Sequence, residues 1–274
     1  MSIDKIPREL DSLLDSKISS PSVKIQSGLS EVLDAPEAFQ GETPRTKPDV
    51  RDYVVAFLDV LGTSSLMESI EKQGITEREI SDIYYKSIAI EEIFQRHLNS
   101  IKDKLGDELK YMVISDSFVI AVPDSLDAII ALVIFIKEFQ YSCLKEIAQP
   151  LRGAVTKGKI IGNITKNKII GSAFTKAHKA EGKIALYPRI ILDPKIADSF
   201  SSNERWLISK DRDGIFYVDF VGDEPNADLL ESVETSLNNE TEFSSERQKW
   251  DWLHAYLVQK YSPQTKKSSL PIKG

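Results

Sequence analysis

The feature that most constrains the fold is a short apolar run at residues 53–62, Tyr-Val-Val-Ala-Phe-Leu-Asp-Val-Leu-Gly. β-Branched and aromatic residues in a run of this length predict a buried strand. The run contains one carboxylate, Asp59, and an unpaired buried charge is strongly unfavourable. A divalent cation at the end of the strand accounts for Asp59, because hard cations bind carboxylate oxygens. The alternative is a turn residue or helix N-cap before Gly62.

Composition narrows the class of protein. The chain has 274 residues, a net charge of −7, three histidines and the single cysteine Cys143. The acidic balance argues against nucleic-acid binding through a basic face, and one cysteine excludes a disulfide within the chain. The longest apolar stretch, residues 128–136, is too short to insert into a membrane. With no apolar signal segment at the N-terminus, we expect a cytoplasmic protein.

Polar and proline-rich sequence separates three regions. Residues 1–50 are punctuated by Ser, Pro and Gly and predict an arm or linker. Residues 51–200 hold the strongest strand and helix patterns and form the predicted core. Residues 201–274 form a predicted C-terminal extension that packs on the core, with a strand at 215–220 and a helix at 243–261.

The core has a readable order of elements. After the first strand, a helix is predicted at 63–70 and a longer one at 76–98, where Thr76 and Glu79 form a capping-box pattern. A hairpin is predicted at 109–123, followed by a helix at 124–147 that Asp124 or Ser125 caps. The glycine-rich segment 151–164 predicts a strand with a bend or bulge. A helix ending at 185, a strand at 188–192 and a short helix from 193 complete the core.

This order predicts an α+β fold of the ferredoxin-like, split β-α-β type. In that topology the first strand and the central hairpin are neighbours, so Asp59 lies close to Asp116 at the hairpin tip. Two carboxylates there make a two-metal clamp of the kind used in phosphoryl transfer. Asp116 also has a simpler interpretation, since Asp and Ser favour turns.

Four segments together resemble class III nucleotide cyclases. Residues 57–62 resemble the first metal motif, F-x-D-[IV]-x-G, and residues 114–116 the second, I-G-D, with Ser115 in place of glycine. Residues 151–158 resemble R-x-G-[IV]-x-x-G with one residue fewer before the first glycine. Residues 170–181 resemble I-G-x-x-V-N-x-A-x-R-x-E. The similarity spans residues 53–192, so the predicted core would be the nucleotide cyclase catalytic domain.

Departures from the adenylate cyclase pattern point to a different base. The two positions that read adenine hold Met112 and Lys168, and the motif's Asn and Arg are replaced by Thr175 and Lys179. This pattern is similar to the pyrimidine cyclases of bacterial anti-phage (Pycsar) systems. The resemblance therefore implies conversion of UTP or CTP to 3′,5′-cyclic UMP or cyclic CMP and diphosphate, as a second messenger in anti-phage defence.

The resemblance also implies the cofactors, the partners and a set of site residues. Two Mn²⁺ or Mg²⁺ ions per site would bind Asp59, Asp116 and the Val60 carbonyl, with Lys179 neutralising the α-phosphate in the transition state. The implied substrate-binding residues are Phe57, Leu61, Gly62, Thr63, Met112, Lys168 and Thr175. The implied partners are a second copy of the chain, which completes each site, and a separate effector protein that reads the product.

Simpler interpretations of these residues stay open. Phe57 suits the core, Lys179 suits a solvated helix face, Lys168 suits a polar turn, and Arg152 suits a surface ion pair rather than a phosphate contact. Two other functions also stay open: an adenylate or guanylate cyclase with an atypical base pocket, and an inactive cyclase-like module that binds nucleotides. A diguanylate cyclase or a polymerase palm is disfavoured, because the sequence has no Gly-Gly-Asp/Glu-Glu-Phe run.

Overall fold

The structure is a computed structural model and describes residues 50–62, 76–161, 169–222, 226–242 and 244–262. The predicted N-terminal arm, the predicted helix at 63–70 and the turn containing Lys168 lie outside these ranges. Among the residues that the structure describes, none of the helices combines the length and apolar character needed to cross a bilayer.

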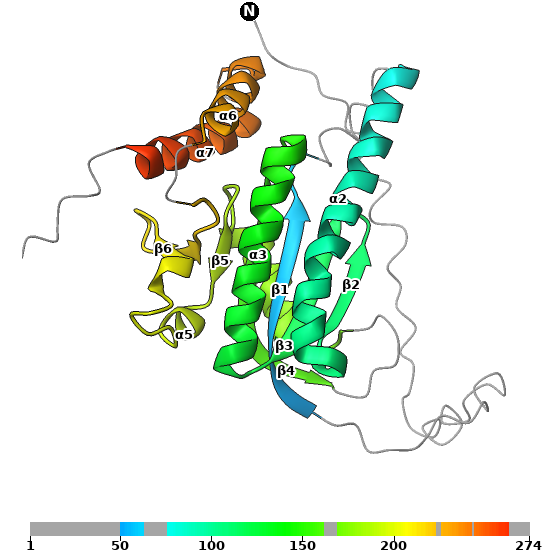
Figure 1. The fold of residues 1–274 in the computed structure, drawn as a ribbon, viewed down its shortest axis with the longest axis vertical. Coiled ribbons are helices and arrows are strands. Elements are labelled where there is room, and N and C mark those ends of the chain that lie inside the picture. Colours follow the sequence, from blue (N-terminus) through cyan, green and yellow to red (C-terminus); the bar gives the residue numbers. More distant parts are fainter. Residues whose placement is uncertain (1–49, 63–75, 162–168, 223–225, 243, 263–274) are drawn as a thin grey trace, which may run out of the picture. The chain divides into compact units, whose positions relative to one another are not determined.

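The described strands form one mixed sheet of seven strands in the order β2-β3-β1-β4-β5-β7-β6 (Figure 1). Their bounds are β1 Val50–Val60, β2 Lys110–Ile114, β3 Ser117–Pro123, β4 Leu151–Ile161, β5 Ile190–Leu192, β6 Ile208–Lys210 and β7 Phe216–Val218. The helices are α2 Glu77–Leu105, α3 Leu126–Ile147, α4 Ser172–Ile184, α5 Pro194–Ala197, α6 Ala227–Asn239 and α7 Ser245–Tyr261, with 3-10 turns η2 Gly106–Glu108 and η3 Arg205–Leu207.

The strand order confirms the predicted α+β, split β-α-β topology. β1 lies between β3 and β4 and is antiparallel to both, while β2 pairs with the outer side of β3. This is the arrangement expected when two β-α-β units interlock, with the hairpin β2-β3 placed beside β1. Beyond β4 the sheet continues with β5 parallel to β4, β7 antiparallel to β5, and β6 antiparallel to β7.

Local sequence signals fix the ends of the core helices. The predicted capping box is present: the Glu79 amide donates to Thr76 Oγ1, and the Thr76 amide donates to the Glu79 carboxylate. α2 is longer than predicted and ends at Leu105 before Gly106, which has a φ of 51° that favours glycine. Ser125 caps α3, while Asp124 pairs with Lys157.

The glycine-rich strand β4 has no bulge, so that part of the prediction is wrong. Its register with β1 is continuous from Leu151 to Ile161. The glycines instead allow neighbouring segments to approach β4 closely. A Cβ on Gly153 would lie 2.4 Å from the Phe57 carbonyl oxygen. A Cβ on Gly158 would lie 2.8 Å from Ser172 Oγ, where α4 begins to cross the strand.

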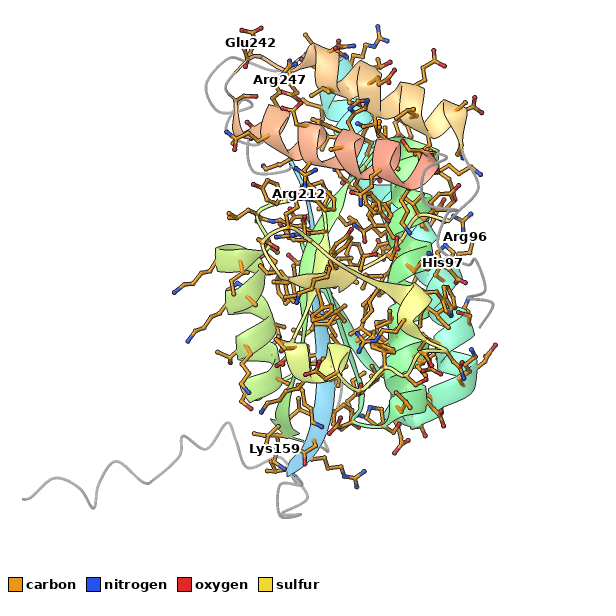
Figure 2. The ribbon with its side chains drawn as sticks, turned by 90° about the vertical axis from the view of Figure 1, so that its left-hand side faces the viewer. Arg96, His97, Lys159, Arg212, Glu242 and Arg247 are labelled. Carbon is orange, nitrogen blue, oxygen red and sulfur yellow. The ribbon has the colours of Figure 1, made fainter. Side chains whose placement is uncertain are left out.

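The sheet separates two apolar layers (Figure 2). Leu58 and Val60 face α2 and α3 and belong to the larger core, in which three phenylalanine rings surround Phe94. Phe57 faces the opposite side, where Ala173 and Ala177 of α4 cover it. Successive side chains of β1 point to opposite faces of the sheet, so β1 contributes to the apolar layer under α2 and α3 and to the one under α4.

The C-terminal region contains more structure than the sequence indicated. The predicted strand at 215–220 is β7, shorter than expected, and the predicted last helix is α7. β6 and α6 had no sequence prediction. Leu253, Tyr256 and Leu257 of α7 are buried against Tyr217 and Phe220, so α7 is packed on the end of the sheet.

Candidate functional site

The site begins where β1 meets the β2-β3 hairpin. Asp59 is directly opposite Ser117 in the register of β1 and β3, and the Val60 amide donates to the Asp116 carbonyl at 3.3 Å. Asp116 follows Ser115, whose φ of 55° shows why glycine suits this turn position. The predicted adjacency of the Asp59 and Asp116 segments is therefore present in the structure.

The Asp59 carboxylate is held by side chains from neighbouring strands. Its Oδ1 accepts a hydrogen bond from Ser117 Oγ at 3.0 Å, and its Oδ2 accepts from Arg152 Nε and Nη2, both at 3.3 Å. Arg152 Nε also lies 2.6 Å from Glu181 Oε1 on α4. Arg152 thus forms the expected ion pair, but in a half-buried position that bridges two carboxylates.

Burial dominates the electrostatics of both carboxylates. Loss of solvent raises the pKa of Asp59 above its ordinary value, and the nearby Asp116 charge adds to this, while Arg152 and Ser117 oppose it. Burial likewise raises the pKa of Glu181, against the effect of Arg152. Asp59 and Glu181 therefore share the single guanidinium of Arg152. A further cation nearby would stabilise the ionised form of these carboxylates.

A cavity of about 610 Å³ opens beside the end of β1. Val60, Leu61, Gly62 and Asp116 line it, so the cavity collects four of the residues predicted for metal or phosphate binding. The Leu61 amide already donates to the Pro150 carbonyl at 3.1 Å. Leu61 therefore forms part of the wall, and the expectation that its N–H group binds a phosphate is not supported.

Four other predicted residues, Phe57, Met112, Thr175 and Lys179, lie on the α4 side of the sheet. Phe57 is buried, with its ring 5.0 Å from His178 and 6.1 Å from Phe174, and Met112 packs against the same cluster. Thr175 is exposed in the first turn of α4 and donates to the Gly171 carbonyl at 3.2 Å. Lys179 is exposed on α4. Thr63 and Lys168 are outside the described ranges.

Two contributors to the site had no assigned role from sequence. Ser117 is identified only by the cross-strand register that places it opposite Asp59. Glu181 is part of the last motif, but its contact with Arg152 depends on how α4 crosses β4. Neither contact has a local sequence signal, because the partners are separated by 58 and 29 positions respectively.

Comparison with known proteins gives a limited result. No protein-family model and no curated protein matches this chain. Among solved structures, a bacterial light-regulated adenylyl cyclase is similar at 13% identity and a TM-score of 0.47, over 78% of this chain and 59% of that one. The guanylyl cyclase Cya2 is similar at 13% identity and a TM-score of 0.43, over 66% of this chain and 98% of that one.

A double mutant of the guanylyl cyclase domain of the RhoGC fusion protein, from the aquatic fungus Blastocladiella emersonii, is similar at 12% identity and a TM-score of 0.43, over 63% of this chain and 97% of that one. The present chain spans about three fifths, 59%, of the length of the light-regulated enzyme. The fold described above rests on its own strand order, and the site on its own contacts.

Proposed function

We propose that the protein is a pyrimidine nucleotide cyclase that converts UTP or CTP to the 3′,5′-cyclic monophosphate and diphosphate, as a signal in anti-phage defence. The observation that carries the proposal is the meeting of Asp59 and the Asp116 turn. Asp59 itself pairs with Arg152, while its neighbours Val60, Gly62 and Asp116 line a cavity of about 610 Å³. Such a volume is within the range of about 300–1,000 Å³ typical of small-molecule sites.

The residues at this point fit divalent cations bound together with a substrate. Within the described ranges, no three His, Cys, Asp or Glu side chains lie close enough to hold a metal ion by themselves. Mg²⁺ typically uses one or two carboxylates and takes its other ligands from water and substrate phosphates. We therefore assign the two Mn²⁺ or Mg²⁺ ions to Asp59, Asp116 and the Val60 carbonyl.

When bound, these ions would lower the pKa of the ribose 3′-hydroxyl and neutralise the leaving diphosphate. Arg152 keeps the Asp59 carboxylate in place beforehand, at 3.3 Å. Because Glu181 lies 2.6 Å from Arg152, the guanidinium keeps an acidic partner when Asp59 turns to another cation. The half-buried arginine is then never left unpaired, which avoids the penalty of an uncompensated charge.

The two halves of each site are proposed to come from different subunits of a head-to-tail homodimer. Thr175 and Lys179 are exposed on α4 and do not line the cavity at Asp116. In a second copy of the chain they would approach the α-phosphate, where Lys179 neutralises negative charge. The product would be read by a separate effector protein.

Shared sites give a quantitative prediction for mixed chains. After subunit exchange, equal amounts of an Asp59→Ala chain and a Lys179→Ala chain should recover about a quarter of wild-type turnover, because half of the dimers then hold one intact site of two. The measurement is cyclic-nucleotide formation by the mixture and by each chain alone. Mixing Asp59→Ala with Asp116→Ala is the control and should recover nothing. Equal activity of the two mixtures would contradict shared sites.

The base preference is tested by turnover of UTP, CTP, ATP and GTP at equal concentration. UTP and CTP should react roughly tenfold or more faster than the purines, because Met112 cannot donate a hydrogen bond to a base edge. Lys168 donates only, so uracil with two carbonyls should react somewhat faster than cytosine with one. Fastest cyclisation of ATP or GTP would refute the pyrimidine assignment, and CTP ahead of UTP would refute only the order.

A further inference from the structure

Two helices that have no role in the proposed function, α2 and α7, line the cavity at Asp116. Lys86 and Ser87 of α2 line one part of it, and Lys249 and Trp250 of α7 line another. The lysines are 163 positions apart in the sequence, yet both reach the cavity that contains Asp116 and Gly62. Two cationic side chains converging on one cavity indicate an anionic part of a ligand.

α7 is held in place well enough to act as part of a binding site. Trp252 Nε1 donates to Asp211 Oδ2 at 2.8 Å, and the Tyr256 hydroxyl donates to Asp219 Oδ1 at 2.5 Å. Leu253 and Leu257 are at most 1% exposed. Lys249 precedes Trp252, Leu253 and Tyr256 by three, four and seven positions, so it lies on the same anchored face of α7, and its side chain is only 22% exposed.

The charges that line the cavity define the ligand class further. Besides the two lysines, the lining includes the carboxylates of Asp116, Glu240 and Glu246. A bare anion would be repelled by the three carboxylates, and a lone cation by the lysines. A divalent-metal complex of a polyphosphate satisfies both signs, since its metal binds carboxylate oxygen and its phosphate oxygens bind ammonium groups.

We infer that Lys86 and Lys249 bind the polyphosphate of the substrate from the same chain that supplies Asp116, so that the C-terminal helix α7 is part of the nucleotide site. This inference rests on the proposed function in placing the nucleotide at Asp116. Glu246 Oε1 lies 3.6 Å from Lys249 Nζ and competes with the phosphate for that ammonium group. Glu246 therefore weakens binding, and Lys249 strengthens it.

The first test is calorimetric titration of the full-length protein with inorganic triphosphate and with UTP, each in Mg²⁺. Lys86→Ala and Lys249→Ala should each weaken binding of both ligands on the order of tenfold, as for loss of a charged hydrogen bond. Glu246→Gln should tighten binding severalfold. Lys102→Ala, an exposed lysine in the last turn of α2, is the matched control and should bind like wild type. Thermal melting verifies that each variant is folded.

The second test asks whether Lys249 acts in its own chain. At UTP well below KM, a Lys249→Ala chain mixed with an Asp116→Ala chain should show no more activity than the two chains show separately if both residues serve the same subunit's site. A gain on mixing would place Lys249 across the dimer interface and overturn the inference. Triphosphate affinity unchanged in both lysine variants would also overturn it.

The outcomes separate this inference from the proposed function. Lysine-dependent triphosphate binding by a wild-type protein that forms no cyclic nucleotide would refute the cyclase activity and retain the polyphosphate site. Cyclic-nucleotide formation with an unchanged KM in Lys86→Ala and Lys249→Ala would retain the cyclase and refute the site.

Discussion

Asp59→Ala and Asp116→Ala are each expected to reduce cyclic-nucleotide formation by at least about 100-fold, the scale for losing one preorganised electrostatic contact at a reacting centre. Each change removes one of the two carboxylates proposed to bind the substrate's divalent cations. The fold should survive Asp59→Ala, because Arg152 keeps Glu181 as an acidic partner at 2.6 Å. Turnover in Mn²⁺ and in Mg²⁺, together with size-exclusion chromatography, measures both effects.

A matched control lies on the same strand. Asp52 is near the other end of β1, where it is exposed and pairs with Lys159 at 2.6 Å (Figure 2 labels Lys159). Asp52→Ala also removes a carboxylate from β1, but exposed ion pairs contribute little to stability and this one is remote from Asp116 in the strand register. It should retain wild-type turnover. Full activity of Asp59→Ala or Asp116→Ala in Mn²⁺ would refute the two-carboxylate site.

Arg189→Met should destabilise the protein by about 3–5 kcal/mol, because it breaks a buried ion pair and leaves carboxylates without their partner. The Arg189 side chain is 1% exposed and pairs with both Asp211 and Asp213 in the turn between β6 and β7. Its guanidinium also lies 5.9 Å from the ring of Trp252 on α7. Urea unfolding followed by tryptophan fluorescence should show a lower midpoint, and a loss below about 1 kcal/mol would contradict this role.

Arg212 supplies the control for this change. It lies between the two aspartates in sequence and is labelled in Figure 2, but its side chain is exposed. Arg212→Met should change the unfolding free energy by no more than about 0.5 kcal/mol.

The hydrogen bond from Arg189 lowers the pKa of Asp213. The stability gained from that interaction is therefore present above the ordinary Asp pKa and lost as the pH falls through the lowered value.

Local patterns in the sequence were sufficient for most of the core. The apolar run at β1, the Thr76–Glu79 capping box and the Ser115-Asp116 turn are short-range signals, and each appears in the structure. The order of these elements then implied the split β-α-β topology, since few sheet arrangements accommodate a hairpin between two helices. That topology was enough to predict that Asp59 and the Asp116 turn are neighbours.

Other features depended on contacts between distant segments. Gly153 and Gly158 suggested a bend or a bulge in sequence, but the backbone and α4 approach β4 so closely that a side chain would not fit. The short strand β6 and helix α6 gave weak patterns, since three residues carry little periodicity and α6 buries only Leu229 and Val233.

The sequence by itself determined most elements of the core, their order and the two acidic residues at neighbouring strand ends, because periodicity, capping and turn chemistry act over a few positions. Only the tertiary structure decided which groups surround those acids. Arg152 and Glu181 meet Asp59 because α4 crosses β4, and Lys249 reaches the cavity at Asp116 because α7 packs against β7 and α3. Such contacts depend on how the elements pack, and contacts between residues far apart in the chain produce no local sequence pattern from which they could be predicted.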